Sequence, residues 1–163
     1  MTSLRPTPDA AMLRDIDAFA RVLGQDGLHA ALEFLNRRTP HRYTGIYRFD
    51  AELLRNEALY DRYQPTPKQV GAVPLSVTFC SLVGKQQVPL EVLDATTDAA
   101  VRGLIETPVV SYCGVLIRDA QGRPFGTLCH YDTERCQERT TDLPLLEAAA
   151  SQLYRYLQPS RGA

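Results

Sequence analysis

Tryptophan is absent from this chain of 163 residues, and its few cysteines are scattered. They are Cys80, Cys113, Cys129 and Cys136, so no two of them form a Cys-x-x-Cys pair. This spacing is not that of a structural zinc site or of a thioredoxin-like motif, and we expect no metal. Because the first residues lead into charged ones rather than into an apolar leader segment, we expect a cytoplasmic chain with reduced thiols.

Neither sign of charge dominates, since 18 Lys and Arg residues face 19 Asp and Glu residues for a net charge of −1. Without a basic excess to neutralise phosphates, nucleic acid is not an expected partner. The longest uncharged apolar run, residues 107–117, is too short to span a bilayer. The chain shows no internal repeat and no low-complexity segment.

Apolar residues at helical spacing mark both ends of one expected domain, residues 9–158. Helices are predicted over 9–23, with Asp9 as the N-cap, and over 28–35, with a glycine-containing break between them. A last helix starts near Asp142, and its apolar seam has heptad spacing: Leu143, Leu146, Ala150, Leu153 and Leu157. Residues 1–8 are expected to be a flexible arm and residues 159–163 a tail.

Strand-like segments lie between these helices. They are predicted at 43–50, 53–60 and 89–92, with a short helix at 76–84, and a hairpin joins 109–117 to 125–131. Apolar residues occupy both parities of the hairpin strands, so the sheet should be covered on both faces. The fold class expected from this order is α+β.

The hairpin carries the most specific motif of the chain. Val109–Asp132, which reads VVSYCGVLIRDAQGRPFGTLCHYD, closely resembles the last hairpin of GAF domains. Ser76–Cys80 and Leu93–Asp98 resemble the middle helix and following loop of the GAF type found in bacterial sensor proteins. Thr44–Asp50 resembles their first strand, and the pieces follow in the same order over about residues 9–158.

This resemblance implies a GAF-like, PAS-like fold. The antiparallel sheet carries the terminal helices on one face, and short helices and loops cover a ligand pocket on the other. Members of the family bind cyclic nucleotides, linear tetrapyrroles, haem or amino-acid-like metabolites, and the fold alone does not select among them. The expected function is a small-molecule-binding sensory domain. No output domain follows the last helix in this sequence, so the expected signal passes through contacts with a partner protein.

The hairpin also predicts part of the ligand pocket. If its strands pair directly through the turn, Cys113 lies near Cys129 on a face shared with Ser111, Thr127 and Tyr131. The opposite parity carries Val110, Gly114, Leu116, Gly126 and Leu128, and its two glycines favour close approach of the terminal helices. We therefore expect the Ser/Cys/Thr face to line the pocket. If the strand register differs by one residue from the one assumed, the two faces exchange their places.

Four further pocket residues are predicted from other segments. Phe79 and Cys80 belong to the middle helix. Arg48 lies mid-strand, where it either holds an anionic ligand group or extends to the sheet edge. Asp94 lies in the loop that follows the family pattern, where it either bonds a ligand or caps the next turn.

Two alternatives to ligand sensing remain. One GAF branch, the free methionine-(R)-sulfoxide reductases, uses pocket cysteines, and a sulfenic acid resolved by a second thiol would suit that chemistry. The cysteines here do not match the catalytic motif of that branch, so binding is preferred over catalysis. A redox or haem sensor is the other alternative, with His130 as a candidate haem ligand or, as we favour, a hydrogen-bonded core residue. His41 is expected at the surface.

The apolar seam of the last helix allows two arrangements. It packs on the sheet of its own chain, or it pairs with the same helix of a second subunit. By analogy with many GAF dimers, we expect a homodimer through the terminal helices.

Overall fold

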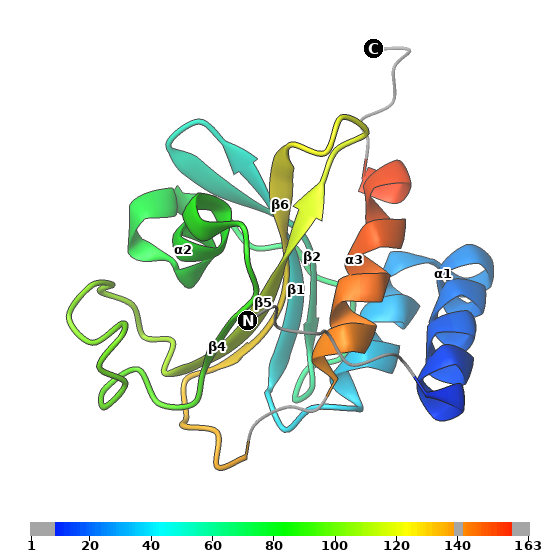
Figure 1. Cartoon of the computed structure of the whole chain (residues 1–163), viewed down its shortest axis with the longest axis horizontal. Helices are drawn as coiled ribbons and strands as arrows, with labels where there is room; N and C mark the ends of the chain where they lie inside the picture. The colour runs from blue at the N-terminus through cyan, green and yellow to red at the C-terminus, as the bar shows by residue number, and fades with distance from the viewer. Residues whose placement is uncertain (1–8, 139–141, 158–163) are drawn as a thin grey trace, which may run out of the picture.

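The computed structural model describes residues 9–138 and 142–157, so the predicted arm and tail lie outside the described residues. It is an α+β structure built on one six-stranded antiparallel sheet in the order β3-β2-β1-β6-β5-β4 (Figure 1). Its elements are α1 (Ala10–Asn36), β1 (Tyr43–Asp50), β2 (Leu53–Asp61), β3 (Val73–Pro74), η1 (Leu75–Val77), α2 (Phe79–Gln86), β4 (Leu90–Val92), β5 (Ser111–Arg118), β6 (Pro124–Asp132) and α3 (Leu143–Leu157).

The terminal helices α1 and α3 lie side by side on one face of the sheet, as expected (Figure 1). The predicted cap is confirmed, because the Asp9 carboxylate accepts a hydrogen bond from the backbone N–H of Met12 at 2.8 Å. The predicted break is a kink within one helix rather than a gap between two. It lies at Gly27, whose φ of 91° is readily adopted only by glycine.

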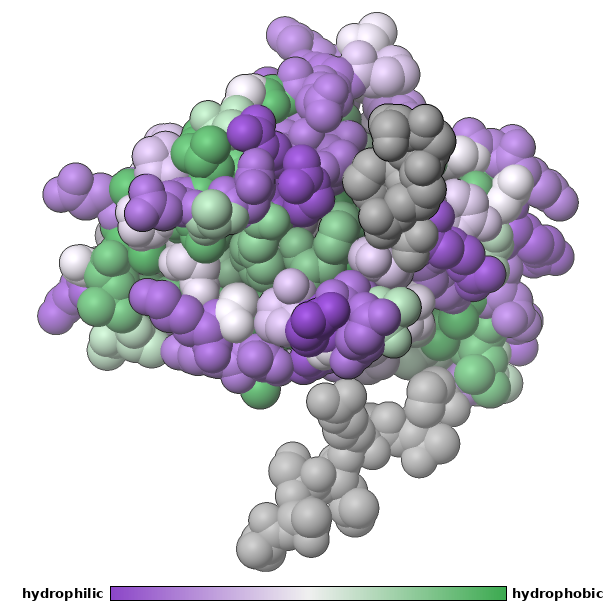
Figure 2. Space-filling view, turned by 90° about the horizontal axis from the view of Figure 1, so that it is seen from above, coloured by the Kyte–Doolittle hydropathy of each residue, from purple (hydrophilic) through white to green (hydrophobic). Residues whose placement is uncertain are grey.

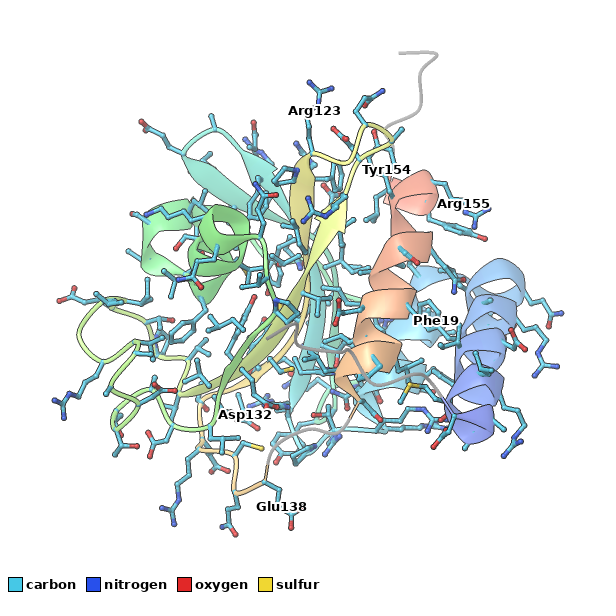
Figure 3. All side chains as sticks on the ribbon, in the orientation of Figure 1. Phe19, Arg123, Asp132, Glu138, Tyr154 and Arg155 are labelled. Carbon is cyan, nitrogen blue, oxygen red and sulfur yellow. The ribbon has the colours of Figure 1, made fainter. Side chains whose placement is uncertain are left out.

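A hydrophobic core fills the space between these helices and the sheet. Phe19 lies between α1 and α3 (Figure 3) and is fully buried. From α3, the core receives four residues of the predicted seam, namely Leu146, Ala150, Leu153 and Leu157. This seam packs inside its own chain, so the first of the two predicted arrangements is confirmed. The homodimer stays a prediction.

The opposite face of the sheet is covered by α2 and by the long segment between β4 and β5 (Figure 1). A second hydrophobic cluster packs there, so the prediction of a sheet covered on both faces is confirmed. Helix α2 begins after Thr78, whose hydroxyl accepts a hydrogen bond from the backbone N–H of Ser81 at 3.3 Å. None of the helices in the described part of the chain is long and apolar enough to cross a bilayer.

Candidate functional site

A cavity of about 300 Å³ lies on the sheet face covered by α2. Strands β1, β5 and β6, the start of α2 and the loop segments around residues 70–73 and 106–109 form its walls. This volume is at the lower end of the range of roughly 300–1,000 Å³ found for small-molecule sites. The lining residues central to the site are Tyr47, Phe79, Cys80, Tyr112, Cys129 and Tyr131.

Two buried thiols lie in the wall of this cavity. The N-cap at Thr78 places Cys80 in the first turn of α2, pointing at the sheet. The Cys80 sulfur accepts a hydrogen bond from the Thr127 hydroxyl at 3.1 Å and lies 3.3 Å from the Tyr112 hydroxyl. The Cys129 thiol, which interacts electrostatically with Cys80, donates a hydrogen bond to the backbone carbonyl of Gly45 at 3.8 Å. The two thiols and their partners therefore form one continuous polar cluster in an otherwise apolar wall.

This cluster makes the two thiols unequal. Burial raises the pKa of the Cys80 thiol, but hydrogen bonds from Cys129, Thr127 and Tyr112 outweigh burial and bring that pKa below its usual value. Burial and the neighbouring Cys80 raise the pKa of Cys129 well above its usual value. The start of a helix also favours a negative group. Of the two thiols, Cys80 is therefore the one that loses its proton more readily, and Cys129 holds its proton more strongly.

A pair of tyrosines completes the wall next to the thiols. The Tyr47 and Tyr131 hydroxyls are 2.5 Å apart and hydrogen-bonded to each other. Burial raises the pKa of both groups, so both remain neutral phenols. The Tyr43 ring stacks on Tyr131 with their centroids 4.9 Å apart, which fixes the ring orientation.

Five of the predicted pocket residues are found at this cavity. Phe79, Cys80, Cys129 and Tyr131 line it, and Thr127 lies behind the lining and reaches Cys80 through its hydroxyl. Their role in ligand binding stays a prediction.

The predicted place of Ser111 and Cys113 beside Cys129 is wrong. Cys113 pairs with His130 and packs in the core beneath the terminal helices, while the Ser111 hydroxyl donates to the backbone carbonyl of Glu134 at 2.7 Å. The cause is an irregularity in the β5–β6 ladder next to the turn, between Ile117 and Arg118, which shifts the register by one residue. Such a shift moves every later side chain of the strand to the other face.

The predicted glycine face is wrong for β5, for the same reason, whereas on β6 Leu128 packs in the core beneath the terminal helices as predicted. Gly114 pairs with Cys129 on the cavity side, and the Tyr112 side chain lies over it. A side chain at Gly114 would overlap the Tyr112 hydroxyl, so this glycine allows that hydroxyl to reach Cys80. Gly126 lies against the backbone of Tyr47 on the neighbouring strand, where a side chain would overlap it.

Arg48 and Asp94 are not among the residues that line the cavity. The Arg48 guanidinium donates to the Glu57 carboxylate at 2.7 Å, so this arginine is already paired across β1 and β2. The Asp94 carboxylate accepts hydrogen bonds from the backbone and hydroxyl of Thr96 at 2.9 and 2.6 Å. The capping interpretation of Asp94 is therefore the one that the structure supports.

The histidine nearest in sequence to the thiols faces the other core. His130 is buried, and its Nδ1 lies 2.7 Å from the Thr44 hydroxyl, so the interpretation as a core histidine is confirmed. Its ring stacks on His41 with centroids 5.9 Å apart. The expectation that His41 lies at the surface is wrong, because only 3% of it is exposed.

Of the six lining residues central to the site, two were missed from the sequence. Tyr47 and Tyr112 lie on β1 and β5, where periodicity alone does not say which face is the cavity. A signal for Tyr112 does exist, since an aromatic residue two positions before a strand glycine shares its face and can cover it. The cavity segments around residues 70–73 and 106–109 gave no such signal.

A second, larger groove of about 720 Å³ lies between the β1–β2 turn and α2. It is lined by apolar residues such as Phe49, Leu53 and Leu75. Figure 2 shows hydrophobic side chains gathered on the α2 side of the molecule. It contains no thiol or tyrosine. Converging reactive and hydrogen-bonding groups mark a functional site better than volume does, so the candidate site is the cavity at the thiols. Among the described residues, no group of three His, Cys, Asp or Glu side chains is placed to hold a metal.

The sequence matches no protein-family model, and a search of curated proteins found no match. Solved structures are similar in fold. The GAF domain of an Acinetobacter phosphoenolpyruvate-protein phosphotransferase has a TM-score of 0.71 at 14% identity, over 92% of this chain and 94% of that one. A free methionine-R-sulfoxide reductase from Neisseria meningitidis has 0.65 at 17% identity, over 99% of each chain. A phycocyanobilin-bound GAF domain of a cyanobacterial phytochrome has 0.63 at 15% identity, over 95% and 94%. The fold is therefore that of GAF domains.

Proposed function

We propose that this protein is a small-molecule-binding sensory domain whose ligand occupies the cavity over Cys80 and Cys129. The observation that carries the proposal is this cavity, walled by residues of the sheet, α2 and two loops, with aromatic rings and a few polar groups converging on it. It lies where a GAF fold places its ligand according to the resemblance in the sequence. A bound molecule would contact α2 and the loops as well as the sheet, so it would order several elements at once.

The signal would pass to a partner protein through the surface of the domain. Strands β5 and β6 contact α2 on one face and α3 on the other, which gives a physical link from the cavity to the terminal helices. Dimerisation through the outward faces of these helices is part of the same proposal.

Native mass spectrometry tests the proposal directly. The purified protein should carry a small molecule that denaturation releases. A Val109→Phe variant, which fills the cavity from the loop wall, should lose this mass. The matched variant Val88→Phe, at an exposed position outside the cavity lining, should keep it. Ligand retained equally by both variants would place the binding site elsewhere, and a protein that neither carries a small molecule nor is stabilised by any metabolite would overturn the proposal.

A second candidate function rests on the unequal thiols. Cys80 as thiolate would attack the electrophilic sulfur of a sulfoxide; with one proton taken up from solvent, the sulfoxide oxygen would pass to Cys80, giving the thioether and a Cys80 sulfenic acid. The Cys129 thiol would then displace water from that sulfenic acid and form a disulfide, which an external dithiol would reduce. Similarity of fold to free methionine-R-sulfoxide reductases makes free methionine sulfoxide the substrate to test.

The assay for this second function compares single cysteine variants. Cys80→Ser and Cys129→Ser should each abolish turnover of free methionine sulfoxide with a dithiol reductant. Cys136→Ser, whose thiol bonds only a backbone carbonyl near the surface, should not. No turnover by the wild type, with free-thiol counts unchanged by peroxide, would leave ligand sensing as the function. A haem sensor gains no support, because no histidine lines the cavity in the described part of the chain.

A further inference from the structure

The cavity is walled by aromatic rings from four different elements. They are Tyr47 on β1, Phe79 on α2, Tyr112 on β5 and Tyr131 on β6. The Phe79 and Tyr112 centroids are 5.4 Å apart, those of Tyr47 and Tyr131 are 6.2 Å apart, and both pairs are tilted. Aromatic side chains from four elements therefore surround one space from several sides.

The tyrosine hydroxyls are engaged with protein groups, so the rings offer a ligand more surface than the hydroxyls offer it donors. Tyr47 and Tyr131 bond each other, and the Tyr112 hydroxyl bonds Cys80. Tyr43 covers one face of Tyr131, which leaves its other face and its edge toward the cavity side. The site therefore offers electron-rich surface and few free hydrogen-bond donors.

The formal charge at the site is negative. Glu106 is the one charged residue of the described lining, it is exposed, and its carboxylate has no hydrogen-bond or ion-pair partner among the described residues. No Lys, Arg or His lines the cavity there, and Arg48 is held by Glu57. The start of α2 is capped by this chain itself, because the Thr78 hydroxyl accepts a hydrogen bond from the backbone N–H of Ser81 at 3.3 Å.

From these features we infer that the cavity recognises a small organic cation of the alkylammonium class, with the aromatic rings around its methyl or methylene groups and Glu106 near its charge. This inference rests on the proposed ligand-binding function and specifies its ligand. Aromatic walls attract a cation through the ring quadrupole, and they desolvate it without the donors that an anion requires. A carboxylate at the mouth adds attraction for the cation and repels phosphates and carboxylates.

Three probes of nearly equal shape separate charge from size. Choline carries the cation, 3,3-dimethyl-1-butanol is its neutral carbon analogue, and 3,3-dimethylbutanoate is the anion. By calorimetry or ligand-observed NMR, choline should bind at least about tenfold more tightly than the alcohol, and the carboxylate should not bind. Equal or tighter binding of the alcohol would overturn the cation inference and leave small-molecule binding standing. Binding of the carboxylate in preference to choline would overturn it as well.

Binding of none of the three probes would also overturn the inference, while the native mass spectrum would decide the proposed function separately.

Variants then assign the effect to named side chains. Tyr131→Phe keeps the ring and should retain choline within about threefold, whereas Tyr131→Leu should lose about tenfold. Glu106→Gln, at an exposed position, should weaken choline by about three- to tenfold and leave the alcohol unchanged. Asp17→Asn, on the exposed side of α1, is the matched control and should change nothing. Unchanged choline binding in both Glu106→Gln and Tyr131→Leu would refute the assignment.

Discussion

The buried histidine pair makes the stability of the fold depend on pH. Burial, with smaller contributions from the other histidine and Arg62, lowers the pKa of His130 from 6.5 to about 3. Burial lowers the pKa of His41 from 6.5 to about 4, against an opposing effect of Asp132. In the unfolded chain, both imidazoles take up a proton near pH 6.5. Between pH 6.5 and about 4, the unfolded chain therefore binds more protons, and the free energy of unfolding falls as the pH is lowered.

The size of this effect follows from the shifts. A pH of 5 is about 1.5 units below the pKa of 6.5 that the two histidines have in the unfolded chain, so both are protonated there. In the folded protein both are still mainly neutral at this pH. At about 1.36 kcal/mol per unit, each histidine removes about 2 kcal/mol, and the pair removes about 4 kcal/mol relative to pH 8. That is a large part of the roughly 5–15 kcal/mol by which a typical domain is stable. Carboxylates with lowered pKa values, such as Asp61, titrate below this window.

Urea unfolding at about pH 8, 7, 6 and 5, followed by circular dichroism, measures this loss. Tyrosine fluorescence serves as a second probe, since the chain has no tryptophan. His130→Gln removes one of the two titrations, so the loss between pH 8 and pH 5 should fall from about 4 to about 2 kcal/mol. Equal stability of the wild type at pH 8 and pH 5 would refute the argument. So would the full loss persisting in the variant, because the protons would then be bound elsewhere.

Three further predictions concern the site and its supports. Iodoacetamide should modify Cys80 at lower pH than an ordinary thiol, because the pKa of Cys80 is lowered. Cys113, whose pKa is raised by burial, should react only after denaturation. Equal labelling of the two cysteines, measured by peptide mapping with mass spectrometry, would contradict the lowered pKa of Cys80. In Gly114→Ala the new methyl group should overlap the Tyr112 hydroxyl, which should reduce the free energy of unfolding by about 1–3 kcal/mol and raise the pKa of Cys80. Gly71→Ala is the control for stability, because a methyl group there meets nothing within 4 Å and should change little. Asp61→Asn should cost about 2 kcal/mol in urea unfolding, because the buried carboxylate accepts from the Arg42 guanidinium at 2.8 Å; an unchanged midpoint would show that this pair adds nothing.

The elements of the fold were predictable because their signals are local. A carboxylate before an apolar helical stretch marks the start of α1, and Gly27 marks its kink. Strand alternation and the polar turn mark the β5–β6 hairpin. The two covered faces of the sheet followed from apolar residues at both parities, which needs no knowledge of the partner layers.

The assignment of faces was not predictable, because it depends on a single residue. Beside the turn, Arg118 pairs with Pro124, as the sequence suggested. In the same register Ile117 would pair with Phe125, but it pairs with Gly126, so the register shifts by one residue there. From there to Ser111, every residue of β5 faces the layer opposite to the predicted one. Nothing in the residues around the turn distinguishes a regular ladder from this irregular one. β6 kept its predicted face, and so Cys129 was placed correctly while Cys113 was not.

The same alternation determines how the site is connected to the rest of the molecule. Cys129 faces the cavity and the next residue, His130, faces the core beneath the terminal helices. Likewise Tyr112 contacts Cys80 on the cavity side, and Cys113 packs against the helical layer. A ligand that displaces either cavity residue must therefore shift a backbone that also carries a packed residue of the other core. Because close-packed interiors transmit small displacements, the sheet itself would couple an occupied cavity to α3 under the proposed sensory function.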